Sequence, residues 1–80
     1  MNKKVLKIDI HGMERQAAKH KLENLIRTAP KDVGEIVVVH GYNSGTALLE
    51  MVRGELRHSR ISDKMISVVN PGITTLFLRD

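Results

Sequence analysis

Two short apolar runs in this chain end in the same dipeptide, His-Gly, and a helix-like segment separates them. Apolar and polar side chains alternate in residues 5–10, which is typical of a strand with one buried face. Residues 36–39 are continuously β-branched, as in a buried central strand. Because the carboxyl ends of parallel strands meet at one edge of a sheet, this order predicts that both His-Gly pairs lie at that edge.

The remaining segments extend this unit to a two-layer α/β (α+β) sandwich. Residues 14–28 carry apolar side chains at helical spacing and stop before a proline, and residues 46–58 predict a second helix. Residues 65–69 and 73–79 predict two strands joined into a hairpin. The order βαβαββ predicts a four-stranded mixed sheet with two helices on one face and solvent on the other. We also expect three methionines in the core: Met13, Met51 and Met65.

Length and composition set the class of protein. Eighty residues predict a single domain spanning residues 1–80. The chain has no cysteine, which excludes a disulfide framework and a thiolate zinc site. Lys7 and Asp9 interrupt the first apolar stretch too early for a signal-peptide core, and no stretch approaches the length of a membrane span. We therefore expect a cytoplasmic protein with no membrane partner.

The charge balance favours a nucleic acid as partner. Thirteen Lys and Arg against nine Asp and Glu give a formal net charge of +4, and basic small domains favour anionic ligands. Tyr42 and Phe77 are the only aromatic residues, so phosphate contacts rather than base stacking would dominate binding. Four basic residues near the end of the second predicted helix either complement its dipole or form a phosphate-contacting rim: Arg53, Arg57, Arg60 and Lys64.

Polar residues at the two strand ends form the candidate site. If the first two predicted strands are neighbours, Asp9, His11 and His40 come together beside loop 41–45. Small residues in this loop would let backbone N–H groups approach a phosphate. Structural roles stay open, because Asp9 could bond to loop amides and His40 could be a buried histidine bonded to the backbone. Two histidines and a carboxylate also suit a metal site.

Two motifs resemble a known family. Ile8-Asp9-Ile10-His11-Gly12 resembles the Leu-Asp-Leu-His-Gly signature of small MutS-related (Smr) domains. Val39-His40-Gly41-Tyr42-Asn43-Ser44-Gly45 resembles their second signature, His-Gly-Lys-Gly-x-Gly. The resemblance implies a fold like the C-terminal domain of translation initiation factor three and a nucleic acid as ligand. It also implies endonuclease activity, which is reported for many Smr domains acting on DNA or RNA.

Roles follow from position in these signatures. The resemblance implies that Asp9 and His11 are the catalytic pair, with Asp9 orienting a water, a metal or His11, and His11 acting as general acid or base. No dedicated metal site is inferred, although Asp9 could recruit a hydrated Mg²⁺ or Mn²⁺ through a substrate phosphate. The residues expected to contact nucleic acid are Lys7, Gly12, His40, Gly41, Tyr42, Asn43, Ser44, Gly45 and Arg53.

The second motif departs from the family signature at two positions. Tyr42 stands where the family usually has Lys or Arg, and Asn43 replaces the middle glycine. Asn tolerates the left-handed conformation better than other residues with a side chain, so the shape of the loop can survive. The resemblance thus implies an endonuclease, and these departures keep open the alternative of a non-catalytic nucleic-acid-binding or ribosome-associated interaction module.

Overall fold

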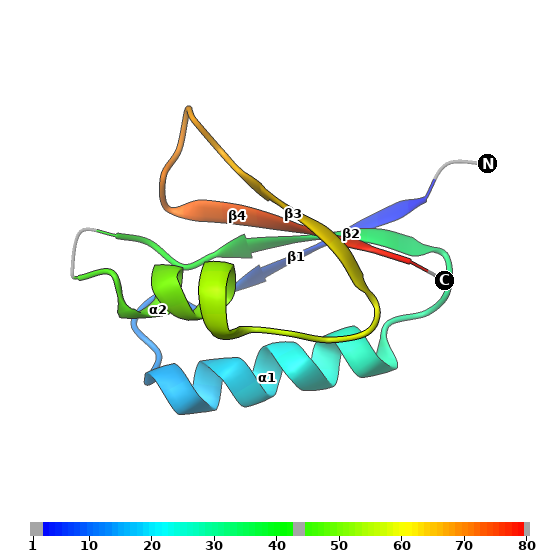
Figure 1. Ribbon diagram of the computed structural model, residues 1–80, viewed down its shortest axis with the longest axis horizontal. Helices are drawn as coiled ribbons and strands as arrows, with labels where there is room; N and C mark the ends of the chain where they lie inside the picture. The colour runs from blue at the N-terminus through cyan, green and yellow to red at the C-terminus, as the bar shows by residue number, and fades with distance from the viewer. Residues whose placement is uncertain (1–2, 43–44, 80) are drawn as a thin grey trace.

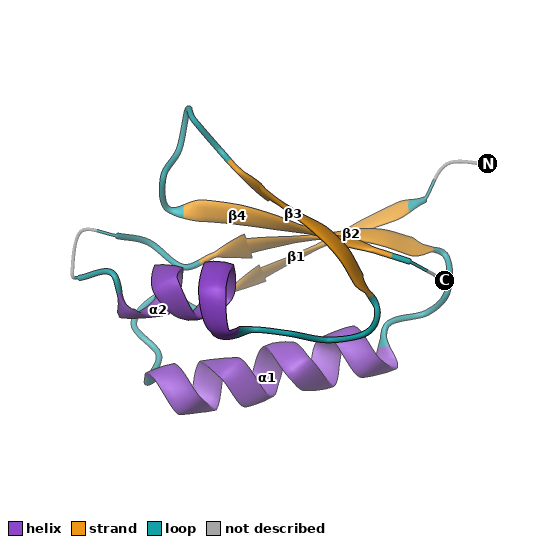
Figure 2. Ribbon diagram, in the orientation of Figure 1, coloured by secondary structure: helices purple, strands orange, loops and turns teal. Residues whose placement is uncertain are grey.

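The computed structural model describes residues 3–42 and 45–79, which form a four-stranded sheet and a helical layer (Figure 1, Figure 2). The elements are β1 (Lys4–Asp9), α1 (Arg15–Thr28), β2 (Val33–Val39), α2 (Ala47–Glu50), η1 (Met51–Glu55), β3 (Ile61–Ile66) and β4 (Ile73–Leu78). The strand order is β1-β2-β4-β3, with β1 and β2 parallel and the other neighbours antiparallel. The predicted βαβαββ mixed sheet with both helices on one face is confirmed.

Helix α1 begins and ends where its sequence predicts. The Glu14 carboxylate caps the first turn by accepting hydrogen bonds from the backbone N–H groups of Gln16 at 3.0 Å and Ala17 at 3.1 Å. The helix stops at Thr28, because a residue that precedes a proline, here Ala29, is driven out of the helical conformation. Its periodic apolar face is buried against the sheet, which confirms the 3.6-residue pattern.

One hydrophobic core lies between the sheet and the helices. The contributors from α1 follow the helical spacing, and Ile10, Ala29 and Leu56 join the core from just beyond β1, α1 and η1. The buried apolar residues are Ile10, Ala18, Leu22, Ile26, Ala29, Val33, Ile36, Val38, Met51, Val52, Leu56 and Leu76. Met13 packs partly against this core, whereas Met65 is 52% exposed, so its predicted place in the core is wrong.

The second helix is shorter than the predicted 46–58. It runs from Ala47 to Glu50 as an α-helix and continues as the π-helical η1 to Glu55, after which Leu56 is extended. Lys64 from β3 donates hydrogen bonds to the carbonyls of Leu56 at 2.6 Å and Arg53 at 3.3 Å. A side chain from another element thus satisfies carbonyls that a further helical turn would have used.

Strand β3 lies four residues before its predicted position. It spans Ile61–Ile66, although the β-branched signal in the sequence lies at residues 65–69. The pairing with β4 decides the position, because the N–H of Arg79 donates to the carbonyl of Arg60 at 2.8 Å and extends the ladder to that end. Val68 and Val69 consequently fall in the β3–β4 turn. The predicted hairpin is present with a longer connection.

The second face of the sheet is not covered by any described helix (Figure 2). Val5 on β1 is 55% exposed there, while Thr75 in the centre of the sheet is buried among its neighbours. No helix among the described residues is both long enough and apolar enough to cross a membrane.

Candidate nucleic-acid site

The two His-Gly motifs lie at the same edge of the sheet. Strands β1 and β2 are parallel neighbours with Asp9 opposite Val39, and the N–H of Ile10 donates to the Val39 carbonyl at 2.9 Å. A Cβ added at Gly41 would lie 3.8 Å from the Cβ of His11. The neighbouring strands that the site prediction required are therefore present.

Asp9 and His11 form a pair on the exposed rim of the sheet. The Asp9 Oδ1 atom bonds to the His11 ring Nδ1 and also accepts the His11 backbone N–H at 3.0 Å. Both side chains are largely exposed, at 53% for Asp9 and 70% for His11. The hydrogen bonds from the ring and then the backbone of His11 lower the pKa of Asp9, so the carboxylate is ionised at neutral pH.

This pairing orients the imidazole of His11. An ionised carboxylate only accepts hydrogen bonds, so Nδ1 carries the proton and Nε2 is not engaged by Asp9. Catalytic histidines are commonly held by a carboxylate in this way, which fixes both the tautomer and the ring direction. The arrangement can present a proton acceptor to a water molecule, or a proton donor once His11 is charged.

His40 is buried and bonded on both ring nitrogens. Its Nδ1 lies 2.8 Å from the carbonyl oxygen of Gly41, and its Nε2 lies 2.8 Å from the hydroxyl of Thr74 on β4. Because a carbonyl only accepts, Nδ1 donates, and Nε2 then accepts from Thr74. The same hydroxyl oxygen accepts from Nε of Arg53 at 3.0 Å. These bonds define a chain from Arg53 through Thr74 to His40 and the loop backbone.

The surroundings of His40 favour its neutral form. Burial lowers its pKa below 6.5, and the nearby charge of Arg53 lowers it further, while the hydrogen bond to Gly41 opposes both effects. With both ring nitrogens bonded and 3% exposure, His40 offers no free ring nitrogen to a bound phosphate. The geometry favours its structural role over direct contact with nucleic acid.

In loop 41–45, the backbone N–H groups of Gly41 and Gly45 are already hydrogen-bonded, so neither is free for a phosphate. Gly41 and Gly45 both have positive φ angles, 74° and 121°, as tight turns demand. However, the N–H of Gly41 donates to the Gly72 carbonyl at 3.0 Å, and the N–H of Gly45 donates to the Tyr42 carbonyl at 3.3 Å. The predicted contacts of Asn43 and Ser44 lie outside the described residues.

A surface hollow of about 720 Å³ joins the two motifs. It is lined by the predicted catalytic residue His11 and, of the predicted contact residues, by Gly12, His40, Gly41, Tyr42 and Gly45. It also includes Asn70 and Gly72 from the β3–β4 turn, which the sequence did not assign to the site. The Asn-Pro-Gly turn signal was visible, but nothing in the local sequence places that turn beside His40. Thr74 was missed for the same reason.

Two predicted contact residues lie around this hollow rather than in it. Lys7 is exposed on β1, two residues before Asp9 on the same face of the strand. The guanidinium of Arg53 bonds to Thr74 and, through Nη2, to the carbonyl of Pro71 at 3.2 Å. Arg53 therefore supports the wall of the site and holds a positive charge beside the β3–β4 turn.

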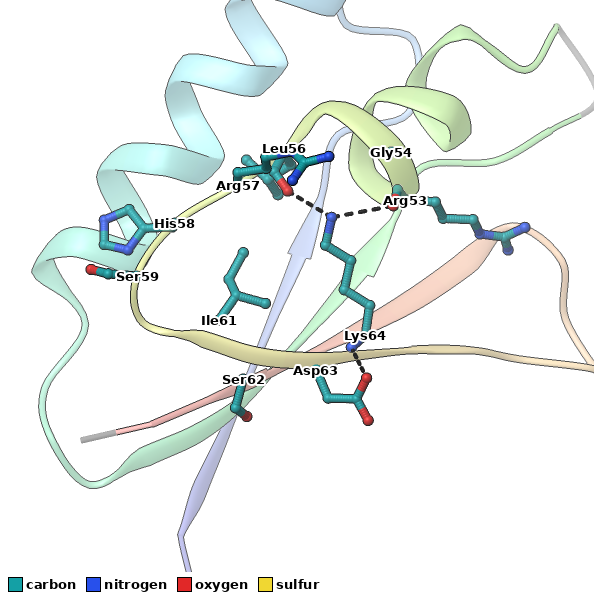
Figure 3. A pocket seen from close by; sticks show the side chains of 10 residues that line it. All are labelled: Arg53, Gly54, Leu56, Arg57, His58, Ser59, Ile61, Ser62, Asp63 and Lys64. Atoms are coloured by element: carbon teal, nitrogen blue, oxygen red, sulfur yellow. Dashed lines mark hydrogen bonds between the residues drawn. The ribbon is translucent and has the colours of Figure 1, made fainter.

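Of the basic cluster predicted at the end of the second helix, Arg53, Arg57 and Lys64 line a separate hollow of about 680 Å³ (Figure 3). Lys64 extends across it to the two carbonyls at the end of η1, and burial lowers the pKa of Lys64. Arg60 binds the end of α1 instead, donating to the carbonyls of Ile26 at 2.7 Å and Ala29 at 2.6 Å. Lys64 therefore fits the interpretation as a complement to the end of the second helix, whereas Arg60 complements the end of α1 instead.

No three His, Cys, Asp or Glu side chains in residues 3–42 and 45–79 are grouped so that they could hold a metal ion. His40 is directed to Thr74 and Gly41, which separates it from the Asp9–His11 pair. The two-histidine metal site considered from the sequence is therefore not formed.

Comparison with known proteins agrees with this fold and with both motifs. The model of the Smr domain family matches residues 8–70. This chain belongs to the Smr domain family. Its structure is similar to the crystal structure of the Smr domain of Thermus thermophilus MutS2, with a TM-score of 0.83 at 20% sequence identity over 94% of this chain and 99% of that chain. At that identity the likeness establishes the fold. No curated protein matches the sequence.

Proposed function

We propose that this chain is a nucleic-acid-binding Smr domain, spanning residues 1–80, that hydrolyses phosphodiester bonds as an endonuclease. The observation that carries the proposal is the Asp9–His11 pair, exposed beside the hollow that joins the two family motifs. Family membership and the net charge of +4 support nucleic acid as the ligand. The cytoplasmic location stays a prediction.

The proposed roles follow from the orientation of the pair. Asp9 holds the Nδ1 proton of His11, and Nε2 removes a proton from the attacking water or returns one to the leaving oxygen. Lys7 on the same face of β1 contacts the adjacent phosphate. A hydrated Mg²⁺ or Mn²⁺ that arrives with the phosphate could be held by the Asp9 carboxylate.

Cleavage of supercoiled plasmid and structured RNA, with Mg²⁺ or Mn²⁺, tests this proposal. Asp9→Asn and His11→Ala are expected to lower the cleavage rate by about 10²–10⁴-fold, the usual contribution of a positioned acid or base. The matched controls are Asp63→Asn and His20→Ala, which change exposed residues on β3 and α1. Absence of cleavage by the unmodified protein, or cleavage that survives both site variants, would refute the endonuclease assignment.

A non-catalytic binding module is the second candidate. Two observations favour it: Tyr42 replaces the basic residue of the family signature, and the amides of Gly41 and Gly45 are already hydrogen-bonded. This candidate predicts binding that weakens steeply with salt, because phosphate contacts release counterions, but no turnover. A nick stimulated by metal and abolished in Asp9→Asn would exclude it.

A further inference from the structure

The β3–β4 turn exposes two apolar side chains that contribute nothing to the core. Val68 is 97% exposed and Val69 is 93% exposed. Figure 1 shows this turn projecting beyond the sheet and away from both helices. Isolated surface valines are common, but two adjacent valines at the tip of a projecting turn form a small exposed apolar patch.

Hydrogen bonds hold the turn in this shape. The N–H of Asn70 donates to the Ser67 hydroxyl at 3.0 Å, and the Asn70 side chain accepts from the N–H of Gly72 at 3.0 Å. The Asn70 carbonyl accepts from the N–H of Ile73 at 3.2 Å. The two valines are stiff at χ1 because they are β-branched. The backbone therefore presents them outward in a defined position.

The same turn forms one wall of the candidate site. The Gly72 carbonyl accepts hydrogen bonds from the N–H groups of His40 at 2.9 Å and Gly41 at 3.0 Å, and Asn70 and Gly72 line the hollow with His11. A Cβ on Gly72 would lie 3.2 Å from the Cα of Gly41, so any side chain there would force the Gly41 backbone to shift. Arg53 adds a cation at the base of the turn through its bond to Pro71.

We infer that Val68 and Val69 form an apolar wedge that enters the base stack of a nucleic acid whose backbone lies in the hollow. The inference rests on the proposed function. The cation of Arg53 at the base of an apolar tip matches a polyanion with apolar base faces, and aliphatic side chains at such tips unstack base steps. Unstacking costs a few kcal/mol in a perfect duplex and less where a base is already unpaired. The preferred substrate is therefore a duplex that contains an unpaired base.

Fluorescence anisotropy with two labelled duplexes tests the wedge, one fully paired and one with a single bulged base. The unmodified protein is expected to bind the bulged duplex at least about tenfold more tightly. In the Val68→Ser/Val69→Ser double variant, the ratio of the affinities for the bulged and the paired duplex should fall close to one. Its affinity for the paired duplex should be unchanged. A 2-aminopurine beside the bulge should brighten with the unmodified protein only. Val5→Ser, on the opposite edge strand, is the matched control.

The possible failures are distinguishable. If the unmodified protein binds neither duplex at low salt, the proposed function fails and the wedge fails with it. If the unmodified protein and the double variant show the same ratio, the nucleic-acid function stands and the wedge is wrong, and the valines then become a candidate contact for a protein partner. An equal loss of preference in Val5→Ser would also overturn the wedge. Thermal unfolding checks that all variants are folded.

Discussion

The two His-Gly motifs share a dipeptide and a backbone conformation, and both lie where β1 and β2 end, but their histidines lie in opposite environments. His11 is exposed and oriented by a carboxylate two residues before it. His40 is 3% exposed and bonded to a threonine 34 residues away. The difference follows from the sheet: β1 is an edge strand, whereas β2 is central and has β4 beside it. The same residue type is therefore available for chemistry in one motif and for stability in the other.

The largest expected difference in stability is between the alanine variants of the two histidines. His40→Ala should lower the free energy of unfolding by about 2–3 kcal/mol, because it removes two hydrogen bonds and leaves the buried Thr74 hydroxyl without its acceptor. His11→Ala should leave stability almost unchanged, since its side chain is mostly in water. Urea unfolding measures both values. Equal effects would contradict the division of roles.

A smaller effect is expected from removing one hydroxyl behind the second motif. Thr74→Val keeps the shape of the side chain but deprives His40 of a donor and Arg53 of an acceptor, at a cost of about 1–2 kcal/mol. The adjacent Thr75→Val is the control, because Thr75 is also buried while His40 and Arg53 bond to the Thr74 hydroxyl. The unfolding midpoints of the two variants provide the comparison. If Thr75→Val lost more stability than Thr74→Val, the Thr74 hydroxyl would not be the group that supports His40.

The glycines should behave alike where the histidines differ. Gly12 and Gly41 have φ angles of 77° and 74°, and an added Cβ would meet no clash at either position. Gly12→Ala and Gly41→Ala should each cost about 1 kcal/mol, from the left-handed backbone alone. Thermal or urea unfolding provides the measurement. A much larger cost at one position would show that the two turns are not equivalent.

The smallest expected effect is a pH dependence specific to the second motif. Burial keeps the pKa of His40 lower in the folded chain than in the unfolded chain. The unfolded state then binds the proton first, so the free energy of unfolding should fall as pH drops below about 6.5. The lowered pKa of Asp9 adds a loss only at more acidic pH, below about 4.

Unfolding at a series of pH values, with an NMR titration of both imidazoles, tests this expectation. His40→Asn should remove the slope just below pH 6.5, and His11→Ala should retain it. A His40 resonance that titrates above 6.5 would contradict the neutral hydrogen-bonded ring.

Several elements could be predicted from short-range patterns. The alternation in β1 and the helical spacing of Ala18, Leu22 and Ile26 in α1 correspond to the buried faces observed. Both motifs are contiguous in the sequence, so the Asp9–His11 pair needed only a strand and a turn to form. These features depend on residues a few positions apart, which the sequence displays directly.

Other features could not be predicted because their partners are distant in the chain. The second helix ends early where Lys64 binds its last carbonyls, and β3 takes its position from pairing with β4. The β-branched signal of Val68 and Val69 pointed to a strand, but both residues lie in a turn. Local propensity is overridden when long-range hydrogen bonds satisfy more backbone groups than the local alternative.

For the site, sequence alone determines which chemical groups are present at each strand end and that a strand and a glycine turn precede each helix. Whether each histidine faces water or the core was decided by the tertiary structure, through β4 and the β3–β4 turn, which bring Thr74 and Gly72 to His40 and leave His11 uncovered. The physical reason is that burial and hydrogen-bond partners set the proton affinity of an imidazole, and both come from distant parts of the chain.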